Sequence, residues 1–190
     1  MSKKEAQEFY PKSKKAWRDW LNINHVDQEA VWVIFFKKKT NKPSMTWSDA
    51  VDEALCFGWI DSTKRALDEE RFIQYFCKRR PKSTWSKVNK EKVKILIDSG
   101  QMSPQGLAAI NIAKENGSWE FLDDADNLVV PNDFQVILDA NITVKKAYLA
   151  LSSSRKKSIL HRLLFAKREE TRKKRITEII AEINLAVLSL

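Results

Sequence analysis

Apolar residues recur with the period of a helix and then with that of a strand in the first part of the chain. Trp17, Trp20 and Leu21 are spaced i, i+3, i+4, which places them on one side of a helix predicted over residues 12–23. The run 31–36 contains only β-branched and aromatic residues and predicts a buried strand. We therefore expect helix and sheet to share an aromatic core.

A second helix and a second strand follow. Thr46 is a suitable N-cap for a helix that has Asp49 at its third position and ends near Gly58, a weaker form of the capping box. Residues 72–77 alternate with period two, which predicts a strand paired with a shorter one near 60–67. The sequence thus predicts two or three antiparallel strands before residue 80.

Beyond Pro81 the strand patterns disappear. Asn89 or Ser86 is a suitable N-cap for a helix predicted over 90–99, and Ser103 for one predicted over 104–116. The acidic segment 118–130 has no clear period, so we expect a connector there. From Pro131 onward the pattern is helical. The predicted fold class is α+β, with a small antiparallel sheet and helices in the N-terminal part and a mostly helical C-terminal part.

Composition is that of a folded globular protein. The chain has 190 residues, of which 43% are hydrophobic, and only four are Gly. We expect an aromatic-rich α+β region over 1–118 and a helical region with basic faces over 119–190, either separate or integrated into one domain. All seven Trp lie in the first two thirds, and we predict that Trp59 and Trp85 are buried in one core.

Basic residues dominate the segment 78–94, where eight Lys and Arg face a single Glu91. Arginine offers forked donors to a phosphate or carboxylate, and the N-terminus of the helix predicted over 90–99 favours anions. The alternative is that Trp85 is a core anchor and the lysines form a solvated face. The candidate site for an anion or small molecule consists of Asp61, Arg79, Arg80, Trp85, Ser86, Lys87 and Asn89.

A second basic feature lies near the C-terminus. Arg168, Arg172 and Arg175 recur at i, i+4, i+7 on one side of a predicted helix, an arrangement that suits a phosphate backbone. The alternative is that this basic face folds back onto the acidic segment 118–139, with Glu120, Asp123, Asp124 and Asp126 as partners. With a formal net charge of +9, the expected partner is anionic: a nucleic acid, an anionic lipid or an acidic protein.

Residues typical of catalysis or metal binding are sparse. Cys56 lies at the C-terminal end of its predicted helix, where the dipole disfavours a thiolate, so we interpret it and Cys77 as free, packed thiols. His25 and His161 lack metal-ligand spacing. We expect no catalytic residue, metal or cofactor. The longest apolar run has seven residues and no signal peptide is evident, so we expect a cytoplasmic protein without a transmembrane segment.

Four segments together resemble the bacteriocin-protection family, also called the YdeI/OmpD-associated family. They are Trp20–His25, Glu53–Asp61, Arg79–Asn89 and Ala166–Ile176, and the resemblance extends over about 9–185. The family's name links it to antimicrobial-peptide resistance and to an outer-membrane protein of an enteric bacterium. The resemblance implies a bacterial protein and brings no catalytic residue or cofactor with it.

Two functions follow as hypotheses. The first is a non-enzymatic binding or stress-protection protein whose basic surfaces meet an anionic partner. The second is an enzyme or small-ligand-binding protein with a pocket between the Cys56–Asp61 turn and the Arg79–Asn89 segment. The sequence leaves the ligand and the oligomeric state open.

Overall fold

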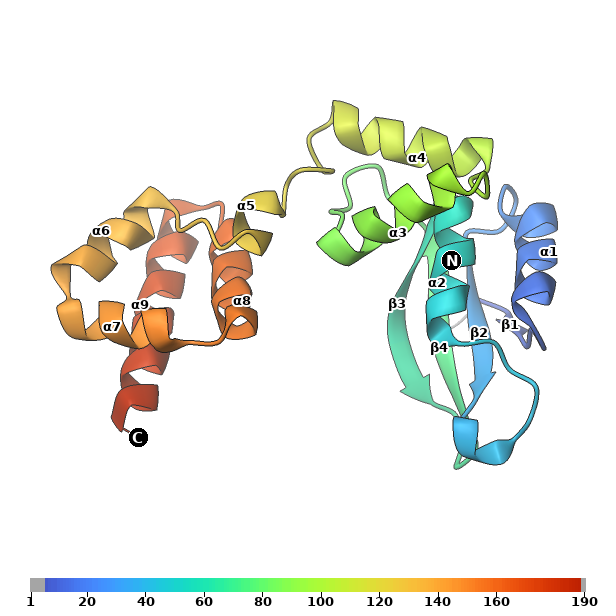
Figure 1. The fold of residues 1–190 in the computed structure, drawn as a ribbon, viewed down its shortest axis with the longest axis horizontal. Coiled ribbons are helices and arrows are strands. Elements are labelled where there is room, and N and C mark those ends of the chain that lie inside the picture. Colours follow the sequence, from blue (N-terminus) through green and yellow to red (C-terminus); the bar gives the residue numbers. More distant parts are fainter. Residues whose placement is uncertain (1–5, 189–190) are drawn as a thin grey trace. The chain divides into compact units, whose positions relative to one another are not determined.

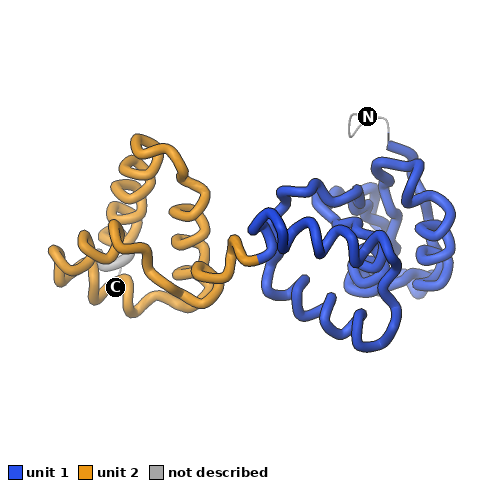
Figure 2. Tube along the Cα trace, turned by 90° about the horizontal axis from the view of Figure 1, so that it is seen from above, with its two compact units in different colours: residues 1–119 blue, residues 120–190 orange. Residues whose placement is uncertain are grey.

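A computed structural model describes residues 6–188, with side chains to residue 185, and confirms the α+β fold class. The chain divides into two compact units, Met1–Trp119 and Glu120–Leu190, coloured separately in Figure 2. The first unit contains the sheet and four α-helices of the described chain, and the second is helical.

The sheet of the N-terminal unit has the order β1-β2-β4-β3 (Figure 1). Strand β4 (Arg71–Lys78) pairs antiparallel with β3 (Trp59–Ala66), as predicted, and on its other side with β2 (Ala30–Phe36), a pairing that the sequence did not predict. Strand β1 (Glu8–Phe9) was not predicted and pairs parallel with β2. Two residues are too few to produce a detectable alternation, so the described sheet has one more strand than the sequence indicates and is not wholly antiparallel.

Helices α1 (Lys14–Asn24) and α2 (Trp47–Cys56) pack against the face of the sheet that carries the side chains of Val31, Val33 and Phe35. The N-terminus of α2 has the predicted capping box: Thr46 Oγ1 accepts the Asp49 N–H, and the Asp49 carboxylate accepts the Thr46 N–H. A 3-10 turn, η1 (Lys38–Thr40), precedes it.

Helices α3 (Lys87–Asp98) and α4 (Pro104–Glu115) complete the unit. Of the two predicted caps for α3, Ser86 is the one used, because its Oγ accepts the Asn89 N–H. Trp59 and Trp85 are 0% and 1% exposed and belong to one cluster, so their predicted burial in a common core is confirmed. Truncation of either ring would leave a large cavity.

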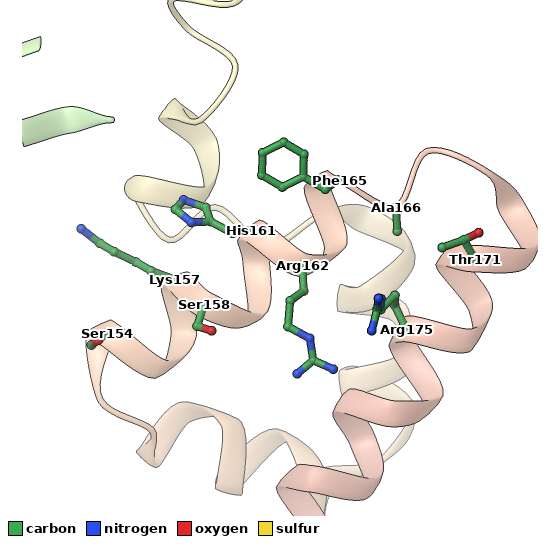
Figure 3. Close-up of a pocket in the computed structure, with 9 residues that line it drawn as sticks. All are labelled: Ser154, Lys157, Ser158, His161, Arg162, Phe165, Ala166, Thr171 and Arg175. Atoms are coloured by element: carbon green, nitrogen blue, oxygen red, sulfur yellow. The ribbon is translucent and has the colours of Figure 1, made fainter. Parts of the chain in front are cut away.

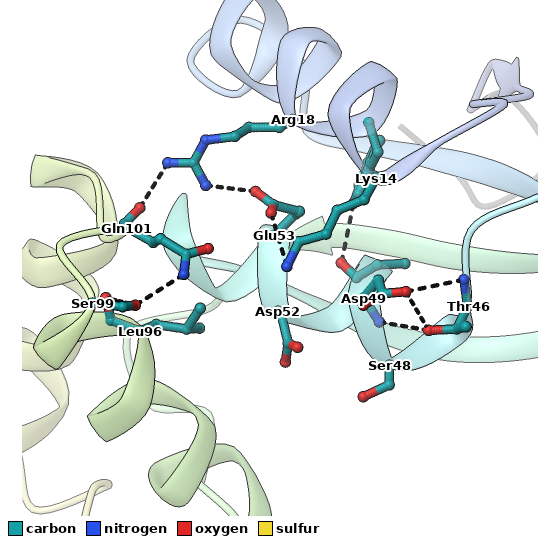
Figure 4. Close-up of polar contacts among 12 residues, drawn as sticks. Lys14, Arg18, Thr46, Ser48, Asp49, Asp52, Glu53, Leu96, Ser99 and Gln101 are labelled. Atoms are coloured by element: carbon teal, nitrogen blue, oxygen red, sulfur yellow. Dashed lines mark hydrogen bonds and ion pairs between the residues drawn. The ribbon is translucent and has the colours of Figure 1, made fainter.

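A buried carboxylate joins α1 to α2 (Figure 4). Glu53 is only 2% exposed, and its carboxylate accepts a hydrogen bond of 2.6 Å from Arg18 Nη1 and lies 3.5 Å from Lys14 Nζ. Arg18 also donates through Nη2 to the carbonyl of Gln101, at 2.7 Å. The pair therefore ties two helices to the loop before α4.

The C-terminal unit contains α5 (Asp123–Asp126), α6 (Asn132–Ala140), α7 (Ile142–Ala150), α8 (Ser153–Leu164) and α9 (Glu169–Leu188). The segment predicted as a connector thus includes one short helix, α5. The apolar side chains of the longer helices form one core, which includes Phe134, Leu138, Val144, Tyr148, Ile159, Leu163, Ile176, Ile179 and Ile183. Within residues 6–188, no helix is both long and apolar enough to span a membrane.

Candidate anion-binding site

The segment that follows β4 is fixed at both sides. Arg79 N donates to the carbonyl of Gly58 at 2.9 Å, which continues the β3–β4 pairing by one step. Two residues further along the chain, the carbonyl of Pro81 accepts a hydrogen bond of 2.8 Å from Asn116 Nδ2, at the C-terminal end of α4. The loop 79–86 is thereby held between the start of β3 and the C-terminal end of α4.

Arg79 stacks on Trp85 within this loop. Its guanidinium carbon lies 3.6 Å from the centroid of the indole, and Nη1 donates to Ser83 Oγ at 3.4 Å and to the Thr84 carbonyl at 3.3 Å. Nε is buried and has no hydrogen-bond partner among the described residues. Burial lowers the pKa of Arg79 to about 10, and the negative charge of Asp61 partly opposes that shift.

A cleft of about 270 Å³ opens beside the stacked pair. The loop supplies two guanidinium groups, a proline ring and the indole, while α4 supplies one amide and three apolar side chains. The lining residues are Arg79, Arg80, Pro81, Trp85, Gln105, Ala108, Ala109 and Ile112. The cleft therefore combines a mostly apolar wall with a cationic rim.

Three of the seven candidate residues line this cleft and four do not. Ser86 and Asn89 are occupied in the cap of α3, and Lys87 is exposed outside the cleft. Asp61 Oδ2 accepts hydrogen bonds from Trp47 Nε1 at 3.0 Å and Gln74 Nε2 at 2.9 Å. Asp61 is thus bound by two neutral donors and does not line the cleft.

The wall from α4 was missed by the sequence analysis. Gln105, Ala108, Ala109 and Ile112 follow the spacing of one helix face. That spacing is a visible signal, but only the tertiary contact between α4 and the loop shows that the face borders a cleft.

The lysines of segment 78–94 are not a uniform solvated face. Lys78 Nζ pairs with Glu29 at 2.6 Å, and Lys92 Nζ pairs with Asp52 at 2.5 Å. Lys90 Nζ donates to the carbonyl of Trp119 at 3.2 Å. Arg80, on the rim of the cleft, is exposed.

The arginines of the predicted basic face have different surroundings. Arg172 makes a two-pronged contact with Asp133, at 2.6 Å and 2.8 Å, and also donates to the carbonyl of Leu163. Arg175 pairs with Glu178 at 2.9 Å, whereas Arg168 is exposed. Arg172 therefore folds back onto the acidic segment, but its partner is Asp133 and none of the four predicted acids.

The thiol and imidazole groups are held by structural contacts. Cys56 is buried, and its burial raises the pKa of the thiol, which disfavours a nucleophilic thiolate. His161 Nε2 lies 3.1 Å from Asp126 Oδ1. Across the part of the chain that the structure describes, no three His, Cys, Asp or Glu side chains are grouped so that they could hold a metal ion.

These features define an α+β protein with a basic N-terminal unit and a helical C-terminal unit. The chain belongs to the family described as a domain of unknown function, DUF8412, whose model matches residues 9–109. The model described as bacteriocin-protection, YdeI or OmpD-associated matches 127–184 and confirms the predicted resemblance to that family. Three of the four segments that suggested the resemblance lie within 9–109. No match is found among curated proteins or among solved structures.

Proposed function

We propose that this chain is a non-enzymatic binding protein that recognises an anionic group of its partner in the cleft beside Arg79 and Trp85. The observation that carries the proposal is the state of Arg79. It is a half-buried cation that contacts an indole, a hydroxyl and a carbonyl, and its buried Nε–H has no acceptor in the described structure. A buried donor without an acceptor costs about 1–3 kcal/mol, so the hydrogen bonds of Arg79 within the protein do not by themselves explain its position beside the cleft.

The wall of the cleft favours a carboxylate attached to an apolar body. A guanidinium binds a carboxylate in a planar, two-pronged geometry, and Arg80 adds a second cation at the rim. Ala108, Ala109 and Ile112 offer no polar contact to the rest of the ligand. At about 270 Å³ the cleft suits a small aromatic acid or the acidic end of a larger partner.

Charge around the cleft supports an anionic partner. Residues 78–119 contain nine Lys and Arg and three Asp and Glu, so cations remain in excess even though Lys78 and Lys92 pair with Glu29 and Asp52. Such an excess raises the local concentration of anions and speeds their association. A binding role also agrees with the buried, protonated state favoured for Cys56. Neither Cys56 nor Cys77 forms a disulfide within the described residues, which supports a cytosolic setting, and the bacteriocin-protection match supports a stress-protection role.

The test is a calorimetric titration of the full chain with benzoate and with benzamide, its neutral analogue of similar shape. We expect benzoate to bind and benzamide to bind at least tenfold more weakly. Arg79→Met is expected to weaken benzoate binding at least tenfold. Lys82→Met, a matched change in the same loop but outside the cleft, is expected to leave it unchanged. Equal affinity for the two ligands, or equal loss in both variants, would refute the proposal.

A further inference from the structure

The C-terminal unit has a larger and more polar cleft of its own, between α8 and α9. Its volume is about 740 Å³, within the range of small-molecule sites. Figure 3 shows the residues that line it: Ser154, Lys157, Ser158, His161, Arg162, Phe165 and Ala166 from α8 and its C-terminal end, and Thr171 and Arg175 from α9. No residue of the Arg79–Trp85 cleft takes part, so the two clefts are independent.

The donors in this cleft are those that bind phosphate. Three hydroxyl groups accompany the side chains of Lys157, Arg162 and Arg175. Arg162 and Arg175 extend from facing helices into the space between them (Figure 3). Phosphate oxygens accept several hydrogen bonds at once, and charge-assisted bonds from guanidinium groups are the strongest of these. A carboxylate would use fewer of the donors present.

Two glutamates of α9 hold the arginines without using all their donors. Glu178 accepts from Arg175 Nη1 at 2.9 Å and lies 3.7 Å from Arg162 Nη2, while Glu182 lies 2.8 Å from Arg162 Nη1. Each guanidinium has five N–H groups, so donors remain for a ligand. Glu182 also pairs with Arg155.

The charges around the cleft favour an anionic ligand. Arg155, Lys157, Arg162 and Arg175 outnumber Glu178 and Glu182 by two, and no acid pairs with Lys157 in the described chain. Asp126, 3.1 Å from His161 Nε2, adds one negative charge, and Glu170 and Lys174 beside Arg175 offset each other. An excess of positive charge therefore remains, which favours an anion such as a phosphate monoester.

An aromatic ring lies at one end of the cleft. Phe165 is 57% exposed, and its ring centroid lies 5.5 Å from that of Phe121, which supports it from one side. Exposed aromatic rings next to cations are the surfaces on which nucleobases stack. We propose that the cleft between α8 and α9 binds a nucleoside monophosphate, with its phosphate at Arg162 and Arg175 and its base on Phe165.

Calorimetry of the full chain with AMP, adenosine and inorganic phosphate tests this proposal. We expect AMP to bind at least tenfold more tightly than either fragment. Arg175→Gln and Phe165→Ala change exposed side chains and are each expected to weaken AMP binding about tenfold or more. Lys146→Gln, an exposed charge change on α7, is the matched control and is expected to have no effect.

Three outcomes would overturn the inference: phosphate binding as tightly as AMP, unchanged AMP affinity in Arg175→Gln, or a single-stranded oligonucleotide binding while AMP does not. Circular dichroism spectra of both variants establish that the helices are intact. Arg79→Met is expected to retain AMP binding, so failure of the carboxylate site and failure of this site are distinguishable.

Discussion

The guanidinium carbon of Arg79 lies over the indole of Trp85, 3.6 Å from the ring centroid. This contact places a cation in a largely buried position, where burial lowers its pKa to about 10. The indole face and the Thr84 carbonyl partly replace the lost hydration. Arg79 is thus retained at a cost, which is typical of residues that serve a ligand.

Arg79→Met is expected to change the free energy of unfolding at pH 7 by less than about 1 kcal/mol. The lost cation–π contact, about 1–2 kcal/mol, is offset because the burial penalty on the charge disappears. That penalty is fully present below pH 10, since the folded-state pKa lies below the ordinary value of 12.5. Urea unfolding measures the change, and a loss above about 3 kcal/mol would show that Arg79 is mainly structural.

Trp59→Ala and Trp85→Ala are each expected to lower the free energy of unfolding by about 3–5 kcal/mol, because both rings are buried and leave cavities. Trp59 also loses its hydrogen bond from Nε1 to the His25 carbonyl. Thermal melts compare them with Arg168→Ala, an exposed charge expected to change stability by no more than about 0.5 kcal/mol. Equal shifts in all three variants would contradict the assignment of core and surface.

Gly106→Ala is expected to destabilise the N-terminal unit by about 3 kcal/mol or more. A Cβ at this position would lie 2.2 Å from the carbonyl oxygen of Cys56, so α4 would have to move away from α2. Gly100→Ala is the control: its φ of +68° makes alanine strained, by about 1 kcal/mol, but no atom lies within 4 Å. Denaturant unfolding of the two variants should therefore differ by about 2 kcal/mol, and equal losses would argue against tight packing at Gly106.

Arg18→Met is expected to destabilise more than Glu53→Gln, by about 1–2 kcal/mol. Loss of Arg18 leaves the buried Glu53 carboxylate with Lys14 alone, at 3.5 Å. Loss of the Glu53 charge leaves Arg18 partly exposed and still bonded to the Gln101 carbonyl. Chemical denaturation at neutral pH measures both, and the reverse order would show that the guanidinium is the more buried charge.

Arg172→Met is expected to cost about 1 kcal/mol at pH 7, and the part of the cost that comes from Asp133 is expected to disappear in acid. Hydrogen bonds from Arg172 lower the pKa of Asp133 below its ordinary value of 3.8. The pair therefore contributes stability above pH 3.8 and loses it as the pH falls through the folded-state pKa. Stability curves of the wild type and Arg172→Met between pH 7 and 2 should approach each other at the acid end, where only the hydrogen bond from Arg172 to the Leu163 carbonyl still separates them.

The matched control for this pair is Arg168→Met, whose side chain is exposed on the same basic face. Its stability is expected to follow the wild type within about 0.5 kcal/mol throughout that pH range. If both variants show the same pH dependence, the effect arises from net charge and not from the contact with Asp133.

Local signals in the sequence were sufficient for most of the secondary structure. Thr46, Ser86 and Ser103 cap the helices that they were expected to begin, because capping depends on residues three positions apart. The contact of Arg172 with Asp133 spans 39 positions, and no local pattern encodes such a pairing. The α4 wall of the cleft was unpredictable for the same reason.

Two glycines determine how α4 meets the turn after α2. A Cβ at Gly58 would lie 3.1 Å from the Gln105 carbonyl oxygen, and one at Gly106 would overlap the carbonyl of Cys56. Gln105, which directly precedes Gly106, lines the cleft, and Ala108 and Ala109 follow it on the same wall. The backbone of α4 is in direct contact with the backbone of the turn after α2 there, so α4 cannot move closer to that turn and the width of the cleft is fixed. A bulkier acid would therefore enter the cleft only if a smaller side chain replaced Ile112 or if the loop 79–86 moved away from α4.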